Sequence, residues 1–85
     1  MIAELAFVCP LPAGLHARPA SMLADAVRPF VAGVTLVNHR TGVSVDARSV
    51  LSIVGLDVQL GDKCLLRADG NDAEAALAAA PADRW

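Results

Sequence analysis

Residues 14–29 read "GLHARPASMLADAVRP", and this stretch contains the change of pattern that decides the fold. From Ala17 to about Arg28, apolar side chains recur three and four residues apart, at Ala20, Leu23, Ala24, Val27 and Val31. Ser21, Asp25 and Arg28 would lie on the opposite side. This spacing predicts an amphipathic helix whose apolar stripe faces a core.

Prolines mark both ends of the predicted helix. Pro19 falls in its first turn, where an amide hydrogen would have no helical partner. Pro29 disfavours helical backbone at the residue before it. We therefore expect Arg28 to leave the helical conformation and the helix to end there.

The residues before this helix follow a different period. In Ile2–Val8 the apolar residues Ala3, Leu5 and Phe7 are two apart and would share one face, which predicts a strand. The segment "CPLPAG" ends it, because proline cannot donate to a strand ladder.

The second half of the chain adds two strands, a short helix, a further strand and a final helix. Residues 34–39 and 43–46 alternate and flank "HRTG", which predicts a hairpin. Residues 48–54 favour a short helix, "LDVQLGD" a loop, and residues 63–68 another strand. In "GNDAEAALAAA" a last helix begins, with Asn71 as N-cap and Glu74 completing a capping box, and Pro81 limits it. The order β-α-β-β-α-β-α predicts an α+β fold, an antiparallel sheet with helices on one face.

Length, charge and composition exclude several classes of function. The 85 residues form one domain, and with a net charge of -2 and 4% aromatic residues the chain lacks the basic stripe and stacking platforms of a nucleic-acid binder. Its longest uncharged apolar stretch, residues 7–15, is interrupted by Pro10, Pro12 and Gly14 and is too short to insert into a membrane. No signal peptide is evident, so we expect a cytoplasmic location.

The cysteines and the C-terminal segment carry weaker signals. We interpret Cys9 and Cys64 as two small buried side chains, not as a disulfide or as metal ligands, because ligand spacing is absent. The ending "AAAPADRW" predicts a frayed or cut terminus.

His16 stands immediately before the first helix, where chemistry with anions is favoured. The free amide hydrogens of a first helical turn and the helix dipole together bind phosphate well. The same field disfavours a proton on the ring, so we expect a neutral, nucleophilic imidazole near pH 7. Arg18, two residues on, can direct its planar fork at phosphate oxygens. The residues together suit a histidine that accepts a phosphoryl group.

The residues alone leave a second interpretation open, in which His16 and Arg18 are ordinary solvated surface residues. His39 falls in the predicted hairpin without comparable surroundings, and we interpret it as a surface residue. No serine occupies a nucleophile-elbow pattern, so a hydrolase has no support.

Two motifs, "GLHARPA" and "ARSVLSIVGLDVQLGD", resemble those of the HPr family, the histidine phosphocarriers of the sugar phosphotransferase system. The likeness covers nearly the whole chain and implies an open-faced β-sandwich with strand order 1-4-2-3 and three helices on one face. "LPAGLHARPAS" and "LGDKCLL" further resemble the N-terminal HPr-like domain of fused multiphosphoryl transfer proteins. On that resemblance, residues 1–85 are one HPr-like domain, and the abrupt end at Trp85 is that of a domain excised from a longer chain.

The resemblance also implies the site residues. His16 is the phosphoryl acceptor, through Nδ1, with Ala17 and Arg18 binding the phosphate and Arg18 as charge partner. Ser49 matches a serine that a dedicated kinase phosphorylates in some bacteria, although we favour its role as the cap of the short helix. An apolar rim for docking partners is expected at Pro12, Ala13, Val50, Leu51 and Val54.

The implied function is a phosphocarrier between enzyme I, charged by phosphoenolpyruvate, and a sugar-specific enzyme IIA. No cofactor and no metal are expected. The chain would be a phosphoryl-transfer intermediate, not a stand-alone catalyst, although a fused parent chain would be a phosphoenolpyruvate-protein phosphotransferase. Two alternatives stay open: a regulatory HPr-like binding module that carries no flux, and a nitrogen-branch phosphocarrier.

Overall fold

Seven elements follow one another in the predicted order. They are β1 (Ile2–Val8), α1 (Ala17–Val27), β2 (Gly33–Asn38), β3 (Val43–Asp46), α2 (Val50–Gly55), β4 (Lys63–Asp69) and α3 (Ala73–Ala79). The structure is a computed structural model, and it describes residues 1–85. Each predicted element is present, and its bounds differ from the sequence-based ones by no more than a few residues.

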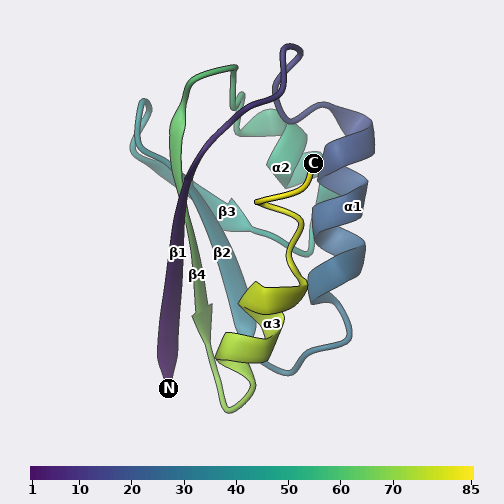
Figure 1. Cartoon of the computed structure of the whole chain (residues 1–85), viewed down its shortest axis with the longest axis vertical. Coiled ribbons are helices and arrows are strands. Elements are labelled where there is room, and N and C mark those ends of the chain that lie inside the picture. The colour runs from purple at the N-terminus through teal and green to yellow at the C-terminus, as the bar shows by residue number, and fades with distance from the viewer.

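The strands form one antiparallel sheet in the order β1-β4-β2-β3, and the helices all lie on one side of it (Figure 1). β4 is central because it pairs with both β1 and β2, so that Leu66 has Leu5 on one side and Leu36 on the other. β2 and β3 form the predicted hairpin, closed by the pair of Asn38 and Val43. The expected α+β open-faced β-sandwich, with strand order 1-4-2-3, is confirmed.

A single apolar core fills the space between the sheet and the helices. On α1 the predicted stripe of Ala20, Leu23, Ala24 and Val27 is fully buried. β4 contributes Cys64, Leu66 and Ala68, the alternate positions that the sequence pattern places on one face. Cys9 and Cys64 are buried free thiols in this core, as expected, and burial raises the pKa of Cys64 to about 11.

The C-terminal end of α1 differs from the prediction in two ways. Arg28 keeps helical backbone angles, and its amide donates to the carbonyl of Ala24 at 3.1 Å. The bias that Pro29 imposes is therefore overcome by this last helical bond and by the ion pair of Arg28 with Asp25. Val31 was wrongly placed on the buried stripe: it is 87% exposed, since the chain has left the helix and the helical period no longer applies.

The start of α3 also differs from the prediction. Asp72 is the N-cap, not Asn71, and no capping box forms, although Glu74 lies in the first turn. The Asp72 carboxylate instead accepts hydrogen bonds from the amides of Val31 and Ala32, at 2.8 Å each. These bonds hold the pKa of Asp72 below its ordinary value. The side chain at the N-cap position therefore makes a contact across about 40 residues and does not cap its own helix.

The C-terminal segment is not frayed. Pro81 ends α3 as predicted, and Ala80, Pro81 and Ala82 are buried. The segment returns along the helical side of the sheet (Figure 1), where the Trp85 ring packs against Phe7 with a centroid distance of 6.2 Å. Apolar contact with the core, which composition alone did not reveal, orders these residues.

Candidate functional site

His16 is the N-cap residue of α1, as the sequence predicted. Its backbone is extended, and its carbonyl accepts the first helical bond from Ala20 at 3.0 Å. The imidazole is exposed and makes no capping hydrogen bond. Both ring nitrogens are therefore available to an incoming group.

The first turn of α1 presents unpaired donors next to this imidazole. No hydrogen bond within the chain uses the amides of Ala17 or Arg18, and Pro19 has no amide hydrogen. Two free amides at the positive end of the helix dipole form a natural place for an anion. The Arg18 side chain is exposed, as expected, and forms no ion pair or hydrogen bond within the chain. Histidine, two amides and guanidinium thus lie within one turn.

The loop that leads to His16 is fixed from behind by close backbone contact. Gly14 has a φ of +70°, and a Cβ built at this position would lie 2.1 Å from the carbonyl oxygen of Val58. The next amide, that of buried Leu15, donates to the same oxygen at 3.1 Å. Only glycine fits here, because both the backbone angle and the available space exclude a side chain. Gly14 therefore sets the approach of the chain to His16.

Ser49 caps α2, which confirms the interpretation favoured from the sequence. Its hydroxyl oxygen accepts a hydrogen bond from the Ser52 amide at 3.2 Å. The residue is partly buried. Because α2 packs beside α1, Ser49 lies in the same helical layer as His16.

The residues expected at the docking rim differ in exposure. Leu51 is 85% exposed, Val54 is exposed, and Pro12 and Ala13 are exposed in the loop before His16. Val50, by contrast, packs partly against the core.

Leu60 is an apolar surface residue that the sequence analysis missed. It is 58% exposed and, with Pro12, Ala13, Gly14 and Gln59, lines a shallow groove of about 310 Å³. The apolar Leu60 in "LDVQLGD", a segment predicted to be a loop, was the available signal.

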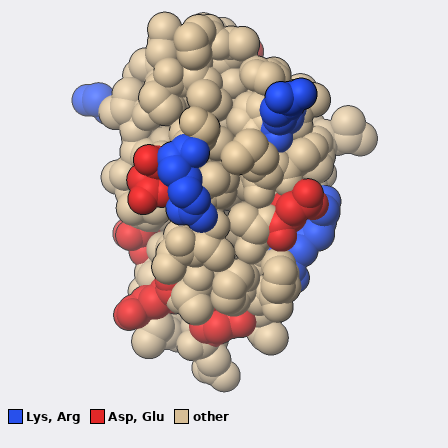
Figure 2. All heavy atoms as spheres, turned by 45° about the vertical axis from the view of Figure 1, so that its right-hand side comes forward, with Lys and Arg blue, Asp and Glu red and all other residues tan.

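Few charged side chains lie at the end of the molecule that carries the loop between β1 and α1. In Figure 2 the region uppermost in the view, where Figure 1 shows the loop between β1 and α1, is largely free of charged side chains. Elsewhere on the same face, charges of both signs stand in small separate groups. No helix in the structure has the length and apolar character needed to cross a bilayer.

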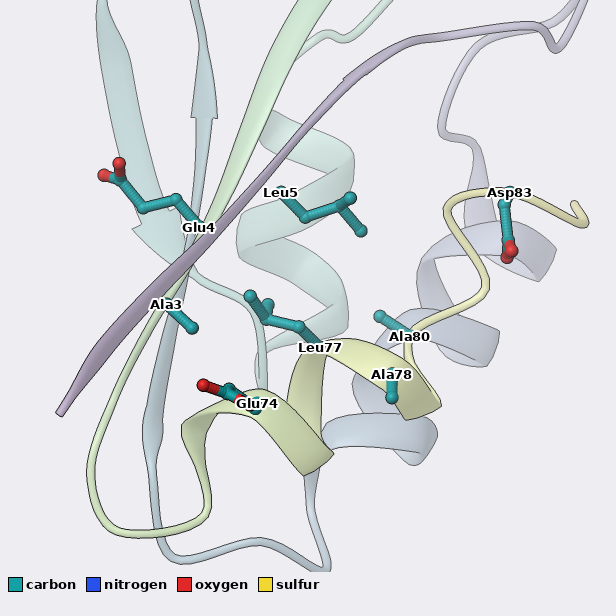
Figure 3. Close-up of a pocket in the computed structure, with 8 residues that line it drawn as sticks. All are labelled: Ala3, Glu4, Leu5, Glu74, Leu77, Ala78, Ala80 and Asp83. Carbon is teal, nitrogen blue, oxygen red and sulfur yellow. The ribbon is translucent and has the colours of Figure 1, made fainter.

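A separate hollow lies between β1 and α3, and no residue of the loop that carries His16 lines it. It has a volume of about 360 Å³, and Leu5 of β1 and Leu77 of α3 are among the residues that line it (Figure 3). Its carboxylates are those of Glu4, Glu74 and Asp83, and Glu4 points away from the hollow. None of the predicted site residues lines it, so it forms no part of the candidate site.

Sequence reasoning also missed a polar cluster behind the site. Asn38 is completely buried although it occupies the inward face of β2, after Val34 and Leu36. Its amide nitrogen donates to Asp62, whose carboxylate also binds Arg40. The signal was available: an asparagine at a core position of an alternating strand requires polar partners.

Comparison with known proteins identifies the family of this chain. A family model described as "PTS HPr component phosphorylation site" matches residues 3–82. Multiphosphoryl transfer protein 1 of Escherichia coli K12 is 41% identical over 70 residues, which are 82% of this chain and 8% of the relative. The multiphosphoryl transfer protein of Salmonella typhimurium is 40% identical over 67 residues, 78% of this chain and 18% of the relative. The chain therefore spans less than a fifth of the length of these relatives.

Solved structures give the same answer over a larger share of their length. The histidine-containing phosphocarrier protein of Mycoplasma superposes with a TM-score of 0.85 at 30% identity, over 91% of this chain and 85% of that one. The phosphocarrier protein HPr of Bacillus anthracis has a TM-score of 0.81, also at 30% identity, over 93% of both chains. With a family match over nearly its whole length, this chain belongs to the HPr family.

Proposed function

We propose that this chain accepts a phosphoryl group on His16 from phosphorylated enzyme I and passes it to a histidine of an enzyme IIA. The observation that carries the proposal is the exposed, uncapped imidazole of His16 beside the two unpaired amides of Ala17 and Arg18. Enzyme I would itself be charged by phosphoenolpyruvate, and for this reason we propose a cytoplasmic location.

Each transfer is a displacement at phosphorus. In the proposed first step the lone pair of a neutral His16 ring nitrogen, Nδ1, forms the new N–P bond. The bond from phosphorus to the donor histidine breaks, and the donor nitrogen keeps the electron pair. In the second step phosphohistidine 16 is the donor, and the acceptor nitrogen belongs to enzyme IIA.

The local groups supply positioning and charge stabilisation, which are the main contributions a protein makes to phosphoryl transfer. The amides of Ala17 and Arg18 can donate to oxygens of the phosphoryl group, and the helix dipole favours its negative charge. The Arg18 guanidinium has no competing partner within the chain, so it can bind the same oxygens with its planar fork. No cofactor is needed for either step.

Docking would use the apolar surface around this loop. Pro12, Ala13, Leu51 and Val54 are exposed, and Leu60 extends the set. A carrier must release each partner quickly, and a modest apolar interface suits transient partners of this kind.

The decisive experiment is incubation with enzyme I and phosphoenolpyruvate, followed by intact mass measurement. We expect a mass increase of one phosphoryl group, lost in acid and retained in base, as expected of a phosphoramidate. His16→Ala should abolish it, and His39→Ala, which removes an exposed histidine outside the site, should retain it. Labelling that survives His16→Ala contradicts the assignment.

An enzyme IIA binding assay and a comparison of two enzymes I separate the alternatives. Binding to enzyme IIA without any labelling would indicate a regulatory module that carries no flux. Faster labelling by a nitrogen-branch enzyme I than by the sugar enzyme would assign the chain to that branch. We expect labelling, and faster labelling by the sugar enzyme.

A further inference from the structure

The nearly buried carboxylate of Asp62 lies at the centre of the polar cluster formed by Asn38, Arg40 and Asp62. The Asp62 side chain is 10% exposed and accepts hydrogen bonds from Arg40 Nε at 3.0 and 3.1 Å and from the Gln59 amide at 2.9 Å. The Asn38 side chain donates a further bond to it at 3.3 Å. The carboxylate is therefore held by donors from β2, from the hairpin turn and from its own loop.

The same side chains fasten the loop between α2 and β4. The Asn38 amide nitrogen also donates to the carbonyl of Leu56 at 3.4 Å, and Arg40 Nη2 donates to the carbonyl of Asp57 at 2.6 Å. Asp57 has a φ of +57°, a conformation that costs free energy for a residue with a Cβ and persists where surrounding contacts impose it. The cluster thus imposes one conformation on this loop.

This loop in turn holds both ends of the loop that carries His16. At the first end, Cys9 donates to the carbonyl of Asp62 and accepts from the amide of Gly61, at 2.9 Å each. At the second end, Leu15 donates to the carbonyl of Val58 at 3.1 Å, immediately before His16. The path from the Asp62 carboxylate to His16 is therefore continuous, through the hydrogen bond to Gln59, the backbone to Val58, and the hydrogen bond from Leu15, which precedes His16.

We infer that Asn38, Arg40 and Asp62 are positioning residues for His16, acting through the α2–β4 loop and the carbonyl of Val58. Hydrogen bonds to a charged group are stronger than neutral ones, so this cluster restrains the loop more firmly than its backbone bonds alone. Leu56 and Val58 anchor the loop in the apolar core, whereas Leu60 is exposed, so the cluster adds polar restraint to a loop that apolar contacts hold only in part. The inference rests on the proposed function only in its second consequence, the rate of transfer.

The first test measures the restraint itself. Arg40→Ala and Asp62→Asn remove opposite members of the cluster, and Asp25→Asn is the matched control, because Asp25 takes part only in a surface ion pair with Arg28. We expect amide hydrogen exchange at Leu15 to become about tenfold faster or more in both cluster variants, with Leu66 unchanged, since local opening sets exchange at such sites. The control should leave Leu15 unaltered.

The second test measures transfer from phosphorylated enzyme I. A displaced reacting nitrogen lowers the rate of the chemical step, so kcat should fall about tenfold in both cluster variants. KM should change less than kcat, because Leu51 and Val54 on α2 remain in place while only Pro12, Ala13 and Leu60 of the docking surface lie in the loosened loops. Arg40→Lys should be intermediate, since one amine cannot reach both Asp62 and Asp57 as the fork does.

The outcomes are distinguishable. If kcat and Leu15 exchange both match Asp25→Asn, the inference is wrong; if the variants lose stability but keep kcat, the cluster is only structural and the inference is equally wrong. Should Asp62→Asn fail to fold, Arg40→Ala decides, because the Arg40 side chain is 42% exposed and its removal leaves the core intact. If the wild-type chain accepts no phosphoryl group, the proposed function fails, and Leu15 exchange alone confirms or overturns the restraint.

Discussion

Gly14 provides the most direct test of how this structure presents His16. Gly14 and Gly42 have nearly the same φ, +70° and +73°, but differ in their surroundings. A Cβ at Gly14 would lie 2.1 Å from the carbonyl oxygen of Val58, whereas a Cβ at Gly42 has no atom within 4 Å. Gly14→Ala and Gly42→Ala therefore share the backbone strain, and only the first adds a collision with backbone.

The magnitudes follow from these two terms. A residue with a Cβ in the left-handed region costs about 1–2 kcal/mol, and the smaller entropy of the unfolded alanine chain offsets about 0.4–1 kcal/mol of it. Gly42→Ala should therefore lower the free energy of unfolding by about 1 kcal/mol. Gly14→Ala should also lose the bond from Leu15 to Val58, about 1 kcal/mol, and add about 1–3 kcal/mol of overpacking. Its total, about 3 kcal/mol or more, is a large part of the roughly 5–15 kcal/mol that stabilises a typical domain.

Thermal unfolding and the enzyme I transfer assay measure the two consequences. We expect Gly14→Ala to unfold at a Tm about 8–16 °C below that of Gly42→Ala, from an extra 2 kcal/mol in a domain of this size. Under native conditions Gly14→Ala should also transfer more slowly, because Val58 and Leu15 must separate and His16 moves with them. Equal stability and equal transfer rates in the two variants would refute the close approach as the reason for glycine.

Three further predictions follow from individual side chains. Arg18→Lys should slow transfer by about tenfold or more while Tm stays constant, because the charge is kept and the planar fork is lost; single-turnover kinetics check this, and an unchanged rate means that guanidinium geometry is irrelevant. Ser49→Asp should leave Tm nearly unchanged, since aspartate also caps helices, and should raise KM for enzyme I by placing charge beside the exposed Leu51; an unchanged KM puts the docking rim elsewhere. The amides of Val31 and Ala32 depress the pKa of Asp72 below its unfolded value of about 3.9, so the stability that it contributes is present above about pH 4 and is lost as pH falls through the lower folded pKa. Asp72→Asn should flatten the acid limb of a urea-midpoint profile between about pH 5 and pH 2, and an equally steep limb would contradict the assignment.

Local sequence determined the elements of this protein and the place of His16. Residues three and four apart bury one side of a helix wherever the chain is helical, so Leu23 and Val27 could be assigned to the core without a structure. Pro19 and the extended residue before the helix likewise follow from the covalent limits of proline and the geometry of an N-cap. Because His16 needs only this local context to stand beside free amides, the candidate acceptor could be predicted from a few adjacent residues.

Tertiary structure decided what depends on partners distant in the chain. Local rules favoured Asn71 as the cap of α3, yet Asp72 is the N-cap residue and its carboxylate binds the amides of Val31 and Ala32, which lie close by only in the folded chain. Val31 lies outside the core because the chain turns there, which no periodicity reports. The support behind His16 is of the same kind: Asp62 and Val58 lie more than 40 residues from it in sequence, and only the pairing of loops at one end of the sheet brings their carbonyls to Cys9 and Leu15. Hydrogen bonds act over a few ångströms, so the folded chain, and not the order of its residues, determines which groups form them.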